Sequence, residues 1–313
     1  MTAALIALSA SLAWGVGDMA AALASRRHRT WSVVFVSQIA GFVIGLSVLY
    51  LLDRPFPGWR AELPALLGGV ALAIGMVAYF EALAVGTMSV VAPIAATCGA
   101  VPVVFGLVAG ERPSTIQALG MLLVFVGVVL SVYQRDSTST VVGTVEVGVA
   151  AHDARRPKNA LAAGLAVVAA VCFGLILVGI AAAAKHDPLW PPVAARITSL
   201  ATLATIAALS GLRSIRRRGA NAGGAKSLAP RQSRMPAGVW VGAVSAGALH
   251  LAAAILFILA SQRGLLSLVA VLSSLSAVVV VGLAHLLLHE RLEGQQLAGV
   301  ILALTGAAAI AGG

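Results

Sequence analysis

Residues 160–184 read ALAAGLAVVAAVCFGLILVGIAAAA. This stretch of 25 residues contains no Asp, Glu, Lys, Arg or Pro. At a rise of about 1.5 Å per residue, a helix of that length crosses the roughly 30 Å hydrocarbon core of a bilayer. A strand of a membrane barrel would instead be about ten residues long and would alternate in polarity. The stretch therefore predicts a transmembrane helix.

Ten segments of this kind occur along the chain. They hold 223 of the 313 residues but only three of the 32 Asp, Glu, Lys and Arg residues, namely Asp18, Glu81 and Arg196. A soluble domain carries about a quarter charged residues, whereas this chain has 10%, so the composition excludes a soluble enzyme. We predict an all-α integral membrane protein of ten transmembrane helices, at 3–24, 31–52, 63–85, 88–109, 115–133, 160–184, 190–212, 237–260, 264–288 and 295–312.

An internal repeat divides the chain. Leu12–Val16 aligns with Val171–Leu175 at an offset of 159 residues, and Ala109–Pro113 aligns with Leu288–Leu292 at an offset of 179. Repetition at a nearly fixed offset is typical of chains built from duplicated structural units. The increase in offset indicates an insertion in the second unit.

The repeat predicts a domain organisation. Two five-helix units, 1–134 and 159–313, are joined by a linker at 135–158, and the insertion falls in the basic loop 213–236. Because five crossings are an odd number, the second unit enters the membrane from the opposite side. Such inverted repeats occur in many secondary transporters, whose substrate site lies near the midplane between the units.

Two motifs resemble a known family. Residues 270–300 read AVLSSLSAVVVVGLAHLLLHERLEGQQLAGV, and Gly110–Pro113 repeats their Glu-Arg helix end. Together with Trp14-Gly15, these motifs resemble the EamA domain of the drug/metabolite transporter (DMT) superfamily, present as two units over essentially the whole chain. The resemblance implies a ten-helix carrier, typically an exporter of metabolites or amino acids. It also implies a central cavity lined by helices 1, 3, 4, 6, 8 and 9.

Carboxylates inside the membrane are candidate functional groups. A charged side chain at the bilayer centre costs about 2.5–3.5 kcal/mol on insertion scales. Asp18 follows Trp14 by one helical turn, and Glu81 lies near Tyr79 at the end of its segment. We expect Asp18, together with Glu81, to bind a cationic or amine-bearing substrate or to carry a coupling proton. In the structural alternative, Asp18 bonds to neighbouring helices and Glu81 extends to the interface.

Other polar groups complete the predicted site. Arg196 either meets a substrate carboxylate, as in related carriers, or extends to the interface. His250 is either a polar contact or proton relay, or a hydrogen-bonded core histidine. Pro93 and Pro102 are expected to kink the fourth helix. The family cavity would also receive small hydroxyls from Thr97, Ser273, Ser274 and Ser276.

We expect no metal and no cofactor. His285 and His289 have metal-ligand spacing, but the intervening glutamate of a zinc-protease motif is missing. Glu111 and Glu290 are interpreted as structural helix ends, paired with Arg112 and Arg291. An Asp-rich Mg²⁺ motif is also missing, so the protein is expected not to be an enzyme. A P-loop is missing too, so we expect no direct use of ATP. An integral membrane enzyme and a non-transporting scaffold or sensor are the alternatives to a transporter.

The distribution of basic residues predicts the orientation of the chain in the membrane and bears on its binding partners. Counting Lys and Arg between the segments gives fifteen on the side of the first loop and five on the other. The positive-inside rule then places both termini outside the cytoplasm, whereas the family resemblance implies both inside. Arg216–Arg218 is read as a loop facing anionic headgroups, not as a nucleic-acid site. We expect a multi-pass protein of the inner membrane that contacts lipids and a small-molecule substrate, as a monomer or homodimer.

Overall fold

The computed structural model describes residues 2–86, 88–133, 159–185, 187–220, 235–288 and 293–313. Within these ranges the regular structure is helical and contains no strand, and ten helices are long and apolar enough to cross a membrane. The prediction of an all-α membrane protein with ten spans is confirmed. The predicted linker at 135–158 lies outside the described residues, as does most of the predicted insertion.

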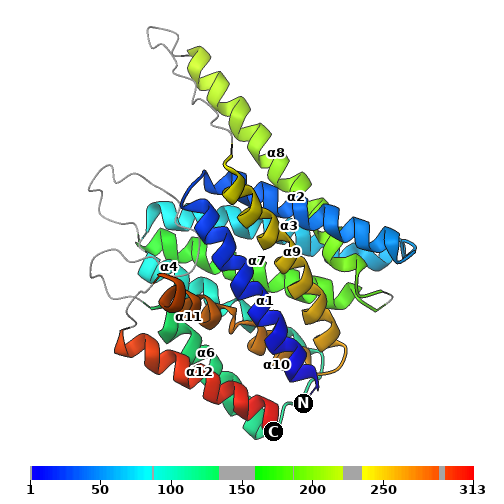
Figure 1. The fold of residues 1–313 in the computed structure, drawn as a ribbon, viewed down its shortest axis with the longest axis vertical. Helices are drawn as coiled ribbons and strands as arrows, with labels where there is room; N and C mark the ends of the chain where they lie inside the picture. Colours follow the sequence, from blue (N-terminus) through cyan, green and yellow to red (C-terminus); the bar gives the residue numbers. More distant parts are fainter. Residues whose placement is uncertain (1, 87, 134–158, 186, 221–234, 289–292) are drawn as a thin grey trace.

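The first half contains α1 (Thr2–Ser25), α2 (Thr30–Leu51), α3 (Trp59–Val85), α4 (Met88–Ala95), the 3₁₀ turn η1 (Ala96–Gly99), α5 (Ala100–Val108) and α6 (Thr115–Val132). The second half contains α7 (Asn159–Ala183), α8 (Trp190–Ala220), α9 (Ala237–Ser261), α10 (Leu266–Ser273), α11 (Ser276–Leu288) and α12 (Gly294–Gly312). The span of α8 ends near Leu209, but the helix continues beyond the predicted end at 212 and projects from the bundle (Figure 1).

Two of the ten spans are broken helices. The fourth is interrupted by η1, which lies between Pro93 and Pro102, where a proline removes a backbone donor and crowds the preceding turn. The ninth is interrupted between Ser273 and Ser276, where no proline is present. At the repeat offset of 179 residues, η1 corresponds to 275–278, which overlaps the end of the second interruption and the first turn of α11.

The two halves pack through helices of opposite direction. Trp14 of α1 contacts Phe257 of α9, and Gly68 of α3 approaches Ile176 of α7. The helices α6 and α12 meet through glycines, because a Cβ on Gly127 would lie 2.6 Å from the Gly299 carbonyl oxygen. The first span of each half, α1 or α7, contacts the third span of the other half, α9 or α3. The fifth spans of the two halves, α6 and α12, contact each other.

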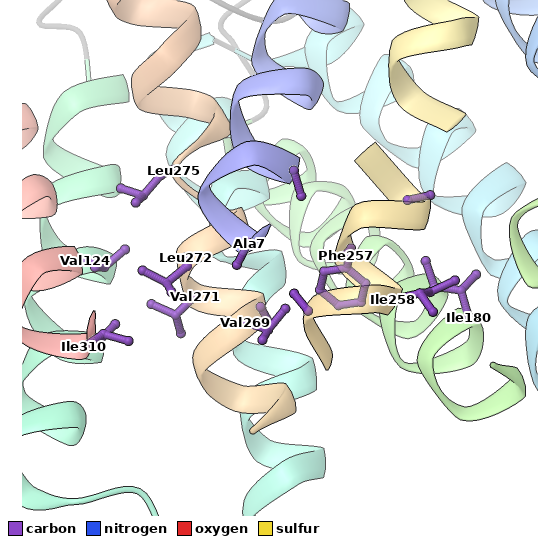
Figure 2. Close-up of a cluster of buried hydrophobic side chains, with 14 of the residues drawn as sticks. Ala7, Val124, Ile180, Phe257, Ile258, Val269, Val271, Leu272, Leu275 and Ile310 are labelled. Carbon is purple, nitrogen blue, oxygen red and sulfur yellow. The ribbon is translucent and has the colours of Figure 1, made fainter. Parts of the chain in front are cut away.

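Both chain ends lie at the same end of the bundle, which we call the terminal face; the opposite end is the distal face (Figure 1). The largest apolar core occupies the half nearer the terminal face. It combines Ile180, Phe257, Ile258, Leu272 and Ile310 from α7, α9, α10 and α12, several of which are fully buried (Figure 2). The helices are therefore packed without a gap toward the terminal face.

Candidate functional site

A cavity of about 420 Å³ lies between the two halves. Its floor includes Ile180, which belongs to the core beside the terminal face. Its wall reaches Ser25 and Val132, in the last turns of α1 and α6 at the distal face. The volume lies within the usual range for small-molecule pockets, roughly 300–1,000 Å³. Of the ten predicted site residues, eight line it: Trp14, Asp18, Tyr79, Arg196, His250, Ser273, Ser274 and Ser276.

The cavity wall contains a carboxylate–imidazole pair. Asp18 of α1 and His250 of α9 approach to 3.0 Å between Oδ1 and Nε2. Their side chains remain 43% and 27% exposed, so a ligand can reach both. Gly17 makes the approach possible, since a Cβ there would lie 2.8 Å from the His250 ring. The pair joins two residues that the sequence presents 232 positions apart, one from each half.

A buried guanidinium forms another part of the wall. Arg196 of α8 is 7% exposed, and its Nη1 donates to the Pro192 carbonyl at 2.9 Å. Its Nε has no hydrogen-bond partner among the described residues. Gly41 of α2 provides the room, because a Cβ there would lie 2.7 Å from that Nε. Since burying a charged group without a partner costs free energy, an anionic ligand group would stabilise this site.

Serines at the break of the ninth span face the same space. Ser273 is 3% exposed and its hydroxyl has no partner among the described residues. The Ser274 hydroxyl donates to the Val271 carbonyl at 2.7 Å. The break thus brings one hydroxyl that is free to bond a ligand to the cavity wall.

Aromatic rings close other sides of the cavity. The Trp14 ring lies 5.8 Å from that of Phe257, and the Tyr79 ring lies 6.1 Å from that of Phe173. Each contact joins a helix of the first half to one of the second. These rings offer flat apolar surfaces next to the Asp18–His250 pair.

Two predicted residues lie elsewhere. Glu81 is exposed and does not line the cavity. Thr97 in η1 donates its hydroxyl to the Ile94 carbonyl at 2.7 Å, which satisfies it within its own helix. Its side chain is also missing from the cavity wall. Both positions were expected from their places along the helices, and which way a side chain points depends on how the helices are rotated.

Gln38 is a polar cavity residue that was not predicted from the sequence. Gln38 of α2 donates from Nε2 to the Ser199 hydroxyl of α8 at 3.1 Å and is 9% exposed. It carries no charge, so a search for intramembrane charges overlooks it. The signal that would have found it is an amide inside the apolar segment 31–52.

Polar contacts between the halves close the terminal face. The Glu111 carboxylate accepts hydrogen bonds from the backbone N–H groups of Leu266 (2.6 Å) and Ser267 (3.0 Å), in the first turn of α10. The expected structural role of Glu111 thus takes the form of a cap on a helix of the other half, and the contacts of its carboxylate among the described residues are with the α10 backbone. Gly110, with φ of 97°, turns the chain back after α5 so that Glu111 can reach α10.

A salt bridge and an amide add to this seal. Arg54 Nη1 lies 3.4 Å from Asp187 Oδ2 of the other half, and within the second half Gln262 Nε2 donates to the Ala184 carbonyl at 2.8 Å. Phe56 packs its ring against Trp190 at 4.9 Å. We call these contacts, with those of Glu111, the terminal seal.

Some predicted features cannot be placed. His289, Glu290 and Arg291 lie outside the described residues. The described residues contain no group of three or more His, Cys, Asp or Glu side chains able to hold a metal ion.

Comparisons with known proteins agree with the fold. Residues 1–133 match the EamA-like transporter family. A comparison with curated proteins finds no match. A solved structure described as "Crystal structure of protein" is similar over 99% of this chain and 98% of its own, with a TM-score of 0.72 and 19% sequence identity. That similarity concerns the fold. The family match confirms the EamA resemblance over residues 1–133.

Proposed function

We propose that this chain, whose residues 1–133 form a unit of the EamA-like transporter family, is a secondary transporter of small amine-bearing metabolites, amino acids or cationic compounds. Membership of that family suggests a membrane transporter, in agreement with the ten spans. The observation that carries the proposal is a cavity between the halves that presents Asp18, Arg196 and His250 in a mostly apolar wall, reaches the distal face and is sealed at the terminal face. Such a site serves alternating access.

The pairing of helices supports an inverted repeat as the basis of that motion. The contacts α1–α9 and α3–α7 are exchanged when the halves are exchanged, and the pair α6–α12 is converted into itself. A packing that is symmetric in this sense offers a second state of similar energy, in which the terminal face opens and the distal face closes. We take the units to be 1–134 and 159–313, joined by the linker.

The charges of the cavity favour particular substrates. Asp18 can accept hydrogen bonds from an ammonium group, and Arg196 can donate to a carboxylate. An amino acid would use both groups, whereas an amine or a cationic compound would use Asp18 alone. Export is the direction that the family resemblance implies, and the inner membrane the expected location.

Asp18 also provides a route to proton coupling. A bound ammonium group favours the carboxylate, whereas a proton on Asp18 removes its attraction for cations. His250, 3.0 Å away, can exchange a proton with Asp18 directly. Proton and cation therefore compete for one group, which is the requirement for exchange of one against the other.

The test uses the purified protein in proteoliposomes. Amines, amino acids and cationic drugs are screened for uptake with and without a proton gradient. For the compound that is transported, Asp18→Asn is expected to abolish gradient-driven uptake while leaving expression and folding intact. Glu81→Gln, which neutralises a carboxylate outside the cavity, is the matched control and should retain uptake.

The alternative functions give different results. A membrane enzyme would convert a compound without accumulating it, and a scaffold would neither convert nor accumulate one. Full uptake by Asp18→Asn would contradict the assigned role of Asp18.

A further inference from the structure

A buried carboxyl group lies in the terminal seal, apart from the cavity. Glu62 is in the first turn of α3, its side chain is 0% exposed, and neither carboxylate oxygen has a hydrogen-bond partner among the described residues. Ionised carboxylates that are buried without a partner or a bound cation cost many kcal/mol, so such a site favours the neutral acid.

Arg54, the cation of the terminal seal, pairs with Asp187 and not with Glu62. Asp187, 8% exposed, receives Arg54 at 3.4 Å and the backbone N–H of Leu189 at 2.7 Å. Its charge acts on Glu62 and opposes a second negative charge nearby. Glu62 is thus left with an acidic neighbour and no cation of its own.

Among the described residues, the helices packed against α3 offer Glu62 no other compensating positive charge. Lys185, which follows α7, and Arg60 of α3 are exposed. The nearest cation within α8 is Arg196, whose guanidinium is engaged at the cavity wall, and α4 has no ionisable side chain. His186 lies outside the described residues.

The position of Glu62 makes its exposure to water depend on whether the terminal face is closed or open. One turn further along α3, Ala65 is fully buried in the core that also contains Ile180 and Ala195. Opening the terminal face would separate these helices and admit water to Glu62. The same carboxyl group is therefore dry in the closed state and hydrated in the open state.

We propose that Glu62 is a proton-binding site whose neutral acid stabilises the closed terminal face and whose carboxylate requires that face to open. On closing, one carboxylate oxygen takes a proton from water at the terminal face; on opening, the proton returns there. This inference rests on the proposed function, since it assumes that the seal opens during transport. With one proton released, the ratio of open to closed molecules rises at most about tenfold per pH unit.

The experiment measures opening without measuring transport. Ala65→Cys is introduced into the full-length protein in which Cys98 and Cys172 are replaced by Ala, and its labelling by a maleimide is followed in detergent from about pH 5.5 to about pH 8.5. Labelling of the exposed position Arg60→Cys corrects for thiol ionisation. The corrected rate is expected to rise with pH, by up to about tenfold per unit. In Glu62→Gln it should stay low and flat.

Glu111→Gln is the matched control. It neutralises another carboxylate of the same seal, but one that already accepts two backbone hydrogen bonds. We expect it to raise labelling at every pH and to keep the pH dependence. If Glu62→Gln does not fold, Glu62→Met replaces it, with the same flat labelling expected.

Two outcomes would overturn the inference: a rate that does not change with pH in the protein with Glu62, or a pH dependence that survives in the Glu62 variants. A response that depends on Glu62 in a protein that transports nothing would contradict the proposed function alone.

Discussion

Three ionisable side chains of the described residues have different electrostatic surroundings. Asp18 is partly exposed and has the His250 imidazole at 3.0 Å. Arg196 is buried and donates to a backbone carbonyl, whereas Glu62 is buried and its carboxyl group has no hydrogen-bond partner among the described residues. Each environment assigns a different task to its residue. In the roles proposed above, Asp18 binds a cation or a proton, Arg196 binds an anion, and Glu62 binds a proton alone.

Arg196 allows a prediction at the scale of one residue. Arg196→Gln is expected to weaken binding of a transported amino acid by about 10- to 150-fold, because a hydrogen bond to a charged group contributes about 1.5–3 kcal/mol. Affinity for the matching amine without the carboxylate should stay unchanged. Competition uptake with the two compounds measures both effects.

Arg263→Gln serves as the control for that comparison. Arg263 is exposed at the end of α9 and donates to the Leu259 carbonyl, away from the cavity. An equal loss of affinity for both compounds in Arg196→Gln would mean that Arg196 has a structural role and does not recognise a carboxylate.

At the scale of elements, glycines decide how closely the helices approach, and the two broken spans decide where the cavity can form. In lipid, helices associate through close backbone packing and hydrogen bonds, because burial of apolar surface gives no gain over contact with lipid tails. The pair α6–α12 is the clearest case. Gly120, Gly127, Gly299 and Gly306 all bring backbone atoms of one helix against the other.

Replacement of one of these glycines should therefore destabilise the fold. In Gly127→Ala the added methyl group would collide with backbone atoms of Ala303 and Gly299, and overpacking of this kind costs about 1–3 kcal/mol. The measurement is the apparent melting temperature in detergent, which should fall.

Gly282→Ala is the matched substitution, in α11 with no atom within 4 Å of the new Cβ. Its melting temperature should be unchanged or higher, because alanine favours a helix over glycine by about 1 kcal/mol. Equal melting temperatures for the two variants would contradict the assigned role of Gly127.

At the scale of the whole molecule, the structure combines a sealed terminal face with a cavity that extends to the distal face. In the sequence, the excess of Lys and Arg falls in the connections that follow the odd-numbered spans, and the described spans α1 and α8 end at the distal face. If that excess sets topology, the cavity extends toward the cytoplasm in this state. If the orientation implied by the family holds, it extends away from the cytoplasm.

A reporter fused after Gly313 decides between the two orientations. The Lys and Arg count predicts that a reporter active only outside the cytoplasm is active in this fusion, and that one active only in the cytoplasm is silent. The reverse pattern would place both termini inside and contradict the prediction from charge.

The ten spans, the EamA resemblance and the charged cavity residues could be predicted from the sequence, because lipid selects each helix by its own length and polarity. Asp18 and Arg196 were found in this way, since an intramembrane charge stands out locally. Glu62 was missed because it lies one residue before the predicted segment 63–85, where a charged residue is expected in a solvent-exposed loop. Glu81 and Thr97 were placed in the site by position, but their side chains do not reach the cavity.

The class of the protein, its membrane crossings and its candidate charges follow from the sequence, since these depend on hydropathy within single segments. The folded arrangement was needed to see that Asp18 meets His250, that Glu111 caps α10, and that Glu62 is buried without a hydrogen-bond partner among the described residues. The physical reason is that these environments arise between helices far apart in the chain. They depend on how helix backbones approach and rotate against each other, which the polarity of one segment does not encode.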